Sequence, residues 1–143
     1  MTARTRTRKT LSPSSQGTPS KRTTRLITAD DLRRFHLIGN QQISPDATQI
    51  LFVKRHVEEP NKQISNLWLV DTKSGKSRQF TTGNKDAMGF WSPCGRKVAF
   101  VSGREKGKAQ IYLISAEGGE ARALTKFPQG SIAGFEWAPD RKS

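Results

Sequence analysis

The stretch WSPCGRKVAFVSGR (residues 91–104) joins a tight-turn signature to a short apolar run, and the chain repeats this combination. An earlier copy reads ISPDATQILFVKR (43–55), and a later stretch, WAPDRKS (137–143), begins in the same way. The prolines of the three turns are spaced 48 and then 46 residues apart, at Pro45, Pro93 and Pro139. Self-similarity at this period is typical of repeat architectures.

A second element recurs between the turns. The segment NLWLVDTKSGKSRQFT (66–81) aligns without a gap with QIYLISAEGGEARALT (110–125), at an offset of 44. Each copy starts with an apolar run that suits a buried strand and continues through a glycine-containing turn. The more polar ends, KSRQFT and EARALT, predict an outer strand with one face in water.

Two further runs complete the repeating unit. QILFV (49–53) and KVAFV (97–101) are rich in β-branched and aromatic residues and predict buried strands. A fourth strand is expected near AMGFW (87–91) or IAGFEW (132–137), before the next turn. Four antiparallel strands per unit of about 46 residues predict an all-β fold, an incomplete β-propeller of about two and a half four-stranded blades. Its blade turns are expected at 44–47, 92–95 and 138–141.

Cys94 is the only cysteine, and it lies in one of these turns rather than in a nucleophile motif. It occupies the position held by Asp46 and Asp140 in the sister turns, where a short polar side chain can bond its own backbone. Pro93 presets φ, and Gly95 tolerates the positive φ that such a turn requires. The repeat therefore favours a structural turn.

Residues 1–25 differ from the rest of the chain in composition. They hold seven basic residues, no acid and Leu11 as the one large aliphatic residue after Met1. Such a segment buries too little apolar surface to offset its ordering entropy, which predicts a disordered basic tail. A targeting segment, weak binding to polyanions and an upstream start codon are alternatives for it. Residues 26–143 are expected to form the partial propeller region, which begins with a short helix capped by Thr28.

Charge and hydropathy narrow the function classes. The net charge is +13, but the residues after the tail carry 18 basic and 12 acidic side chains, so the body is only moderately basic. Nucleic acid is therefore not the expected partner, although the basic tail leaves nucleic-acid binding open as an alternative. With one cysteine and two histidines, the chain has no Cys/His zinc cluster. Neither a signal peptide nor a transmembrane segment is visible, so we expect a cytoplasmic protein without a membrane partner.

The repeated blocks resemble those of known β-propellers. WSPCGRKVAFVSGR and IYLISAEGGEARALT are similar to the W-S-P-D-G and G-G-E-x-x-x-L-T repeats of two groups. These are the TolB-type propellers and the N-terminal domain of prolyl-oligopeptidase-family serine peptidases, which includes acylaminoacyl peptidases and dipeptidyl aminopeptidases. The leading segment LITADDLRRFHLIGNQQISPD (26–46), a capped helix before the first turn, favours the peptidase group. Ala47 departs from the pattern, since the family usually has glycine there.

In the resembled peptidases, catalysis belongs to a C-terminal α/β-hydrolase domain with a G-x-S-x-G motif, and no such motif occurs in this chain. Ser74 is expected in a hairpin turn and Ser102 at a strand end. His36 is expected in the entry helix, and His56 in a loop after a strand. Three aspartates are expected in separate turns, without the spacing of a calcium loop: Asp46, Asp71 and Asp86. The sequence therefore predicts no catalytic, cofactor-binding or metal-binding residue in these 143 residues.

Two functions from different classes follow. The resemblance implies a non-catalytic N-terminal propeller fragment that gates and selects peptide substrates for an absent hydrolase domain. Arg104, after the KVAFVSG strand, is the candidate for a substrate contact. The alternative is a TolB-like protein-binding module with no enzymatic link. An open propeller also leaves edge strands unpaired, so self-association through these edges is expected.

Overall fold

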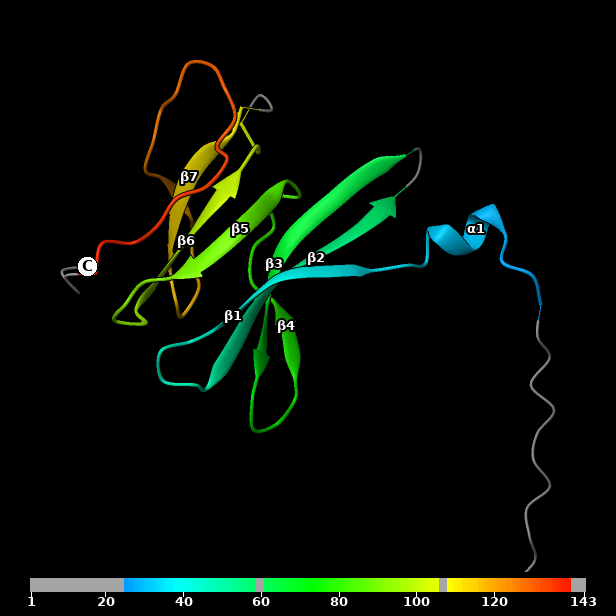
Figure 1. The fold of residues 1–143 in the computed structure, drawn as a ribbon, viewed down its shortest axis with the longest axis horizontal. Helices are drawn as coiled ribbons and strands as arrows, with labels where there is room; N and C mark the ends of the chain where they lie inside the picture. The colour runs from blue at the N-terminus through cyan, green and yellow to red at the C-terminus, as the bar shows by residue number, and fades with distance from the viewer. Residues whose placement is uncertain (1–24, 59–60, 106–107, 140–143) are drawn as a thin grey trace, which may run out of the picture.

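The two repeats fold into two separate four-stranded sheets (Figure 1). The computed structural model describes residues 25–58, 61–105 and 108–139. Both sheets are antiparallel meanders in which neighbours in sequence are neighbours in space. The elements are, in chain order, α1 (Ala29–Leu32), β1 (Leu37–Ile43), β2 (Gln49–Glu58), β3 (Lys62–Asp71), β4 (Ser77–Gln79), β5 (Asp86–Trp91), β6 (Lys97–Ser102), β7 (Gln110–Ser115) and β8 (Arg122–Ala123).

Each sheet is one propeller blade, so the all-β, partial-propeller prediction is confirmed. The apolar runs predicted as strands fall in β2, β3, β6 and β7, and AMGFW falls in β5. The polar segments form the short, exposed outer strands β4 and β8. The inner strand β1 has no counterpart among the predicted strands, because its sequence LIGNQQI contains too few apolar residues to show a strand pattern.

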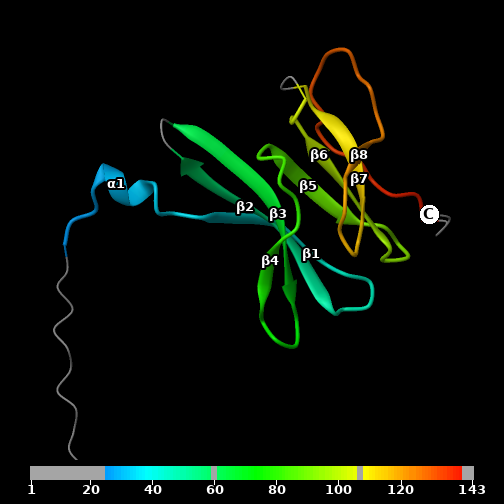
Figure 2. The same cartoon turned by 180° about the vertical axis from the view of Figure 1, so that it is seen from behind.

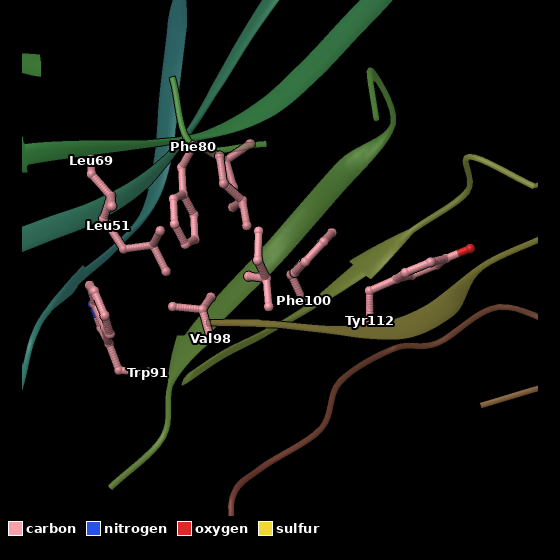
Figure 3. Close-up of a cluster of buried hydrophobic side chains, with 10 residues drawn as sticks. Leu51, Leu69, Phe80, Trp91, Val98, Phe100 and Tyr112 are labelled. Carbon is pink, nitrogen blue, oxygen red and sulfur yellow. The ribbon is translucent and has the colours of Figure 1, made fainter. Parts of the chain in front are cut away.

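The core lies between the two sheets (Figure 3). Alternate residues of β2 and β3 point towards the second sheet, and alternate residues of β6 and β7 point back. Phe100 is fully buried, and its ring stacks on that of Tyr112 with the centroids 5.8 Å apart. The cluster consists of Leu51, Val53, Leu67, Leu69, Phe80, Trp91, Val98, Phe100, Tyr112 and Ile114.

The inner strand β5 makes the closest approach between the blades. It contacts β1, β2 and β3 of the first sheet. A Cβ added at Gly89 would lie 2.8 Å from Leu51 and 2.9 Å from Leu67, so only glycine lets this strand pack so near. Both inner strands also carry a bulge at the same repeat position, with Asn40 and Met88 each at φ 51°.

The two described blade turns share one hydrogen-bond pattern. In the first, Ser44 Oγ donates to Asp46 and accepts from the backbone of Gln49 at 2.9 Å. The hydrogen bonds from Ser44 and from Thr48 lower the pKa of the Asp46 carboxyl. In the second, Ser92 Oγ accepts from the Lys97 backbone at 3.0 Å and lies 3.4 Å from Cys94 Sγ. Cys94 therefore takes the place of Asp46, as the repeat predicts.

These turns give a matched pair of substitutions. Ala47 has φ 58° and Gly95, at the equivalent position, has φ 72°. A Cβ in the left-handed region costs about 1 kcal/mol. We therefore expect Ala47→Gly to raise the free energy of unfolding by about 1 kcal/mol and Gly95→Ala to lower it by a similar amount. Urea titration followed by tryptophan fluorescence measures both changes. If both substitutions shifted the free energy of unfolding in the same direction, backbone strain at the left-handed position would not explain it.

The helix α1 stands apart from both sheets at the start of the chain leading into β1 (Figures 1 and 2). As predicted, Thr28 caps it, and the Asp31 carboxylate accepts from the Thr28 backbone at 2.9 Å. Arg25 forms an ion pair with Asp31, which is the main reason why the pKa of Asp31 lies far below its usual value. The helix ends at Leu32, so His36 lies beyond it, and the placement of His36 in the helix is wrong.

In the sequence, a third blade is expected to begin after the second blade ends near Phe127. The expected strand at 132–137 does not form, and two side chains of this segment contact β5 instead. Trp137 Nε1 donates to the Phe90 carbonyl at 3.2 Å, and the rings of Phe90 and Phe135 meet edge to face at 5.1 Å. The turn at 138–141 lies partly outside the described residues, and so does nearly all of the tail at 1–25. The domain boundary at residue 26 stays a prediction.

Candidate functional site

The linker between the blades converges with the start of β5 and the end of β6. We call this region the linker end; it comprises residues 80–86 and 102–104. Asp86, the first residue of β5, is fully buried, which corrects its predicted place in a turn. Its carboxylate accepts from Gly83 N at 3.0 Å and from Ser102 Oγ at 2.6 Å. It also accepts from Arg104 Nη2 at 3.0 Å.

Arg104 lies inside this cluster, and 24% of its side chain is exposed. Its Nε donates to Ser102 Oγ at 3.0 Å, and its guanidinium lies 4.7 Å from the centre of the Tyr112 ring. The pairing neutralises the buried Asp86 and fixes the backbone that follows β6. The arginine thus has a structural task, and its contact with a substrate stays a prediction.

Gly83 makes this convergence possible. A Cβ at this position would lie 2.4 Å from the Asp86 carboxylate and 2.7 Å from the Arg104 guanidinium. Neither group can move away without breaking the buried ion pair, so only glycine fits at this position of the linker. The cluster therefore ties the linker to the second blade.

Amide side chains of β3 and β7 hold the linkers that follow each blade. Asn66 exchanges two hydrogen bonds with Asn84, at 2.8 and 3.1 Å. Gln110, at the aligned position, bonds the backbone N–H and C=O of Phe127 at 2.8 and 2.9 Å. Neither amide is among the predicted site residues, although their alignment at an offset of 44 marks them as equivalent.

The aligned threonines have one role. Thr81 Oγ1 accepts from the Leu67 backbone at 3.0 Å, and Thr125 Oγ1 accepts from the Ile111 backbone at 2.9 Å. Each threonine closes the end of its blade where the outer strand turns into the linker. The alignment at an offset of 44 thus reflects equivalent structure.

The two histidines pack against each other rather than joining a catalytic set. Their ring centroids are 5.4 Å apart, and His56 Nε2 lies 3.4 Å from the Glu58 carboxylate. Burial, with nearby Lys54 and His56, lowers the pKa of His36. His56 lies within β2, which corrects its predicted place in a loop, because that strand extends to Glu58.

The predicted serines have structural surroundings. Ser74 lies in the β3–β4 turn, where its hydroxyl and backbone donate to Asp71. Ser102 ends β6 as expected and is fully buried among Asp86 and Arg104. Across the part of the chain that the structure describes, no group of His, Cys, Asp or Glu side chains is arranged to hold a metal ion. Within the same residues, no helix is long and apolar enough to cross a membrane.

Comparison with known proteins gives a relative among the peptidases. The chain is 43% identical over 121 residues to the "Uncharacterized peptidase YuxL" of Bacillus subtilis, a match that covers 83% of this chain. The chain spans only 18% of that relative's length. It is also 28% identical over 95 residues to the Tol-Pal system protein TolB of Alcanivorax borkumensis, covering 66% of this chain and 21% of the TolB protein. No family model matches the chain.

Solved structures with the same fold come from both groups. The acylaminoacyl peptidase of Pyrococcus horikoshii superposes with a TM-score of 0.63 at 20% identity, over 77% of this chain and 17% of that one. The β-propeller domain of the trilobed protease from Pyrococcus furiosus gives 0.54 at 18% identity, over 65% and 28%. A putative TolB from Agrobacterium tumefaciens gives 0.50 at 25% identity, over 62% and 30%.

Proposed function

Since the chain is homologous to a peptidase and has the fold of the acylaminoacyl peptidase propeller, we propose that it is the propeller region of a prolyl-oligopeptidase-family serine peptidase. In this role it catalyses no reaction itself. It restricts access to, and selects peptides for, an α/β-hydrolase domain that lies outside these 143 residues. The observation that carries the proposal is the sequence match to a peptidase over 121 of the 143 residues, and therefore over most of both blades.

An exposed apolar segment supports a neighbouring domain. Six large apolar side chains between residues 26 and 38 are more than half exposed, and α1 packs on neither sheet (Figures 1 and 2). Exposed apolar surface of this extent is typical of an interaction site. A hydrolase domain packed on this segment would bury it. The six are Leu26, Ile27, Leu32, Phe35, Leu37 and Ile38.

A chimera tests the gating role. The matching 121 residues of YuxL would be replaced by those of this chain, and kcat/KM would be measured for a short chromogenic peptide and for unfolded casein. We expect the chimera to cleave the short peptide and largely exclude casein. Loosening the blades by Phe100→Ala should raise the casein-to-peptide ratio about tenfold, since a gate discriminates only while it stays closed.

The control is the same chimera with Lys76→Gln, an exposed residue of the β3–β4 turn, which should leave the ratio unchanged. A chimera that cleaves both substrates equally well, with or without Phe100→Ala, would contradict the gating role. A YuxL variant lacking the region would show whether the region also supports folding of the catalytic domain.

The second candidate is a TolB-like protein-binding module. It is favoured by the TolB match at 28% identity and by the superposition at a TM-score of 0.50. It predicts a protein partner for the chain and an inactive chimera. Self-association through the outer edges of the sheets, and a cytoplasmic location, belong to the proposal as well. Light scattering of the purified chain and cell fractionation test these two points.

A further inference from the structure

A second feature of the linker end is an open groove with a basic lining. Its volume is about 440 Å³, and it lies against β2, β3 and the linker. Five polar side chains line it, and no aromatic or acidic residue is among them. They are Arg55, Gln63, Ser65, Asn84 and Lys85.

The floor of the groove is fixed by backbone hydrogen bonds. Ser65 N donates to the Asn84 carbonyl at 3.0 Å, and Gly103 N donates to the Lys85 carbonyl at 3.1 Å. Asn84 adopts φ 60°, a left-handed conformation that asparagine tolerates better than most residues. Arg55 lies directly across the ladder from Ser65. Lys85 therefore projects from linker backbone that is bonded towards both blades, and Arg55 projects from the β2–β3 ladder of the first blade.

The groove carries uncompensated positive charge. Neither Arg55 nor Lys85 forms an ion pair with any residue that the structure describes, whereas Arg104 nearby is neutralised by Asp86. Both cations are exposed, so a ligand can reach them. Gln63, Ser65 and Asn84 add amide and hydroxyl groups that can both donate and accept hydrogen bonds.

We propose that this groove binds the carboxylate of a peptide, with Arg55 and Lys85 as its cationic contacts. A guanidinium matches a carboxylate with two parallel N–H donors, and an ammonium adds a second charge. The neutral side chains fit the amides of a peptide backbone. A nucleic acid suits the groove less well, because no aromatic ring lines it for base stacking. The choice of a peptide ligand rests on the proposed function.

Fluorescence anisotropy on the purified 143-residue chain tests the groove. The probe is a labelled pentapeptide ending in two glutamates, compared with its glutamine counterpart, each with a free or an amidated C-terminus. We expect Arg55→Gln and Lys85→Gln each to weaken binding of the acidic probe about fivefold and the pair to weaken it about twentyfold. Arg55→Lys should weaken it less than Arg55→Gln, since the charge remains and the paired donors are lost.

A charge-matched control separates a site from general attraction. Arg96 and Arg122 are exposed and line a different cavity, beside the β7–β8 turn. The variant Arg96→Gln/Arg122→Gln removes the same charge and should bind the acidic probe like the parent chain. Equal weakening by the two double variants would overturn the proposal, as would equal binding of the neutral amidated peptide.

The arms of the experiment identify the source of the carboxylate. Loss of binding on amidation assigns the groove to a peptide C-terminus, and loss on replacing glutamate assigns it to an acidic side chain. A labelled single-stranded oligonucleotide that binds more tightly than the acidic peptide, through the same two cations, would overturn the peptide assignment. The binding experiment measures no hydrolysis, so its outcome is independent of the chimera. If the groove does not bind the peptide, the gating result still holds. If the chimera shows no gating, binding to the groove can still be measured.

Discussion

Replacing Phe100 by alanine is expected to lower the free energy of unfolding by about 3 to 5 kcal/mol, the range for removing a buried aromatic side chain. Phe100 is fully buried in the centre of the inter-sheet cluster and stacks on Tyr112 (Figure 3). Total stabilities of small domains are about 5 to 15 kcal/mol, so a loss of this size removes a large part of the whole. Urea titration followed by tryptophan fluorescence measures it.

The matched control is Phe35→Ala. The Phe35 side chain is 53% exposed and belongs to neither sheet. Its loss should change the free energy of unfolding by less than about 0.5 kcal/mol, as is usual for surface positions. If the two phenylalanine variants had similar midpoints in urea, the packing between the sheets would not be the source of stability.

The second large effect is expected for Asp86→Ala. It leaves the Arg104 guanidinium without its buried partner and Gly83 N without its acceptor. Breaking a buried pair in this way typically costs 3 to 5 kcal/mol; because Arg104 is partly exposed, we expect about 3 kcal/mol. Urea titration again provides the measurement, with Asp30→Ala as control, since the Asp30 side chain is 88% exposed.

A double-mutant cycle tests whether the cluster acts as a unit. Arg104→Ala alone leaves the Asp86 carboxylate buried and uncompensated, so it should also destabilise. The double variant Asp86→Ala/Arg104→Ala should cost less than the two single effects together, with a coupling of about 1 to 3 kcal/mol. Additive effects would mean that the pair is not coupled and that the linker is held by other contacts.

The two predicted roles of this region depend on different residues. Asp86 and Arg104 hold the linker on the second blade, whereas Arg55 and Lys85 face the groove without described ion-pair partners. Variants of the first pair should change stability, and variants of the second pair should change peptide binding alone. This separation allows binding experiments at full stability.

The sequence by itself determined the strands and turns of the blades. Runs such as KVAFV (97–101) and QIYLI (110–114) are local signals, because β-branched and aromatic residues favour a pleated, buried strand wherever its partner lies. The blade turns are local as well, since Ser92 and Gly95 close them within a few residues. A period of 44 to 48 residues then indicated the propeller, because each repeat buries its apolar face only against the next.

Only the tertiary structure decided which residues the polar groups meet. Asp86 reads as a turn residue, yet Ser102 and Arg104, 16 and 18 positions later, allow it to be buried. Residues 132–137 have strand-like composition, yet they form no ladder. Instead, the Trp137 indole donates to the Phe90 carbonyl of β5, and the Phe135 ring meets the Phe90 ring. From the sequence alone, Arg104 would be read as an unpaired surface charge. Arg55 would be read as an ordinary strand residue. Their roles differ because contacts between distant residues determine which charge is neutralised and which is left to solvent.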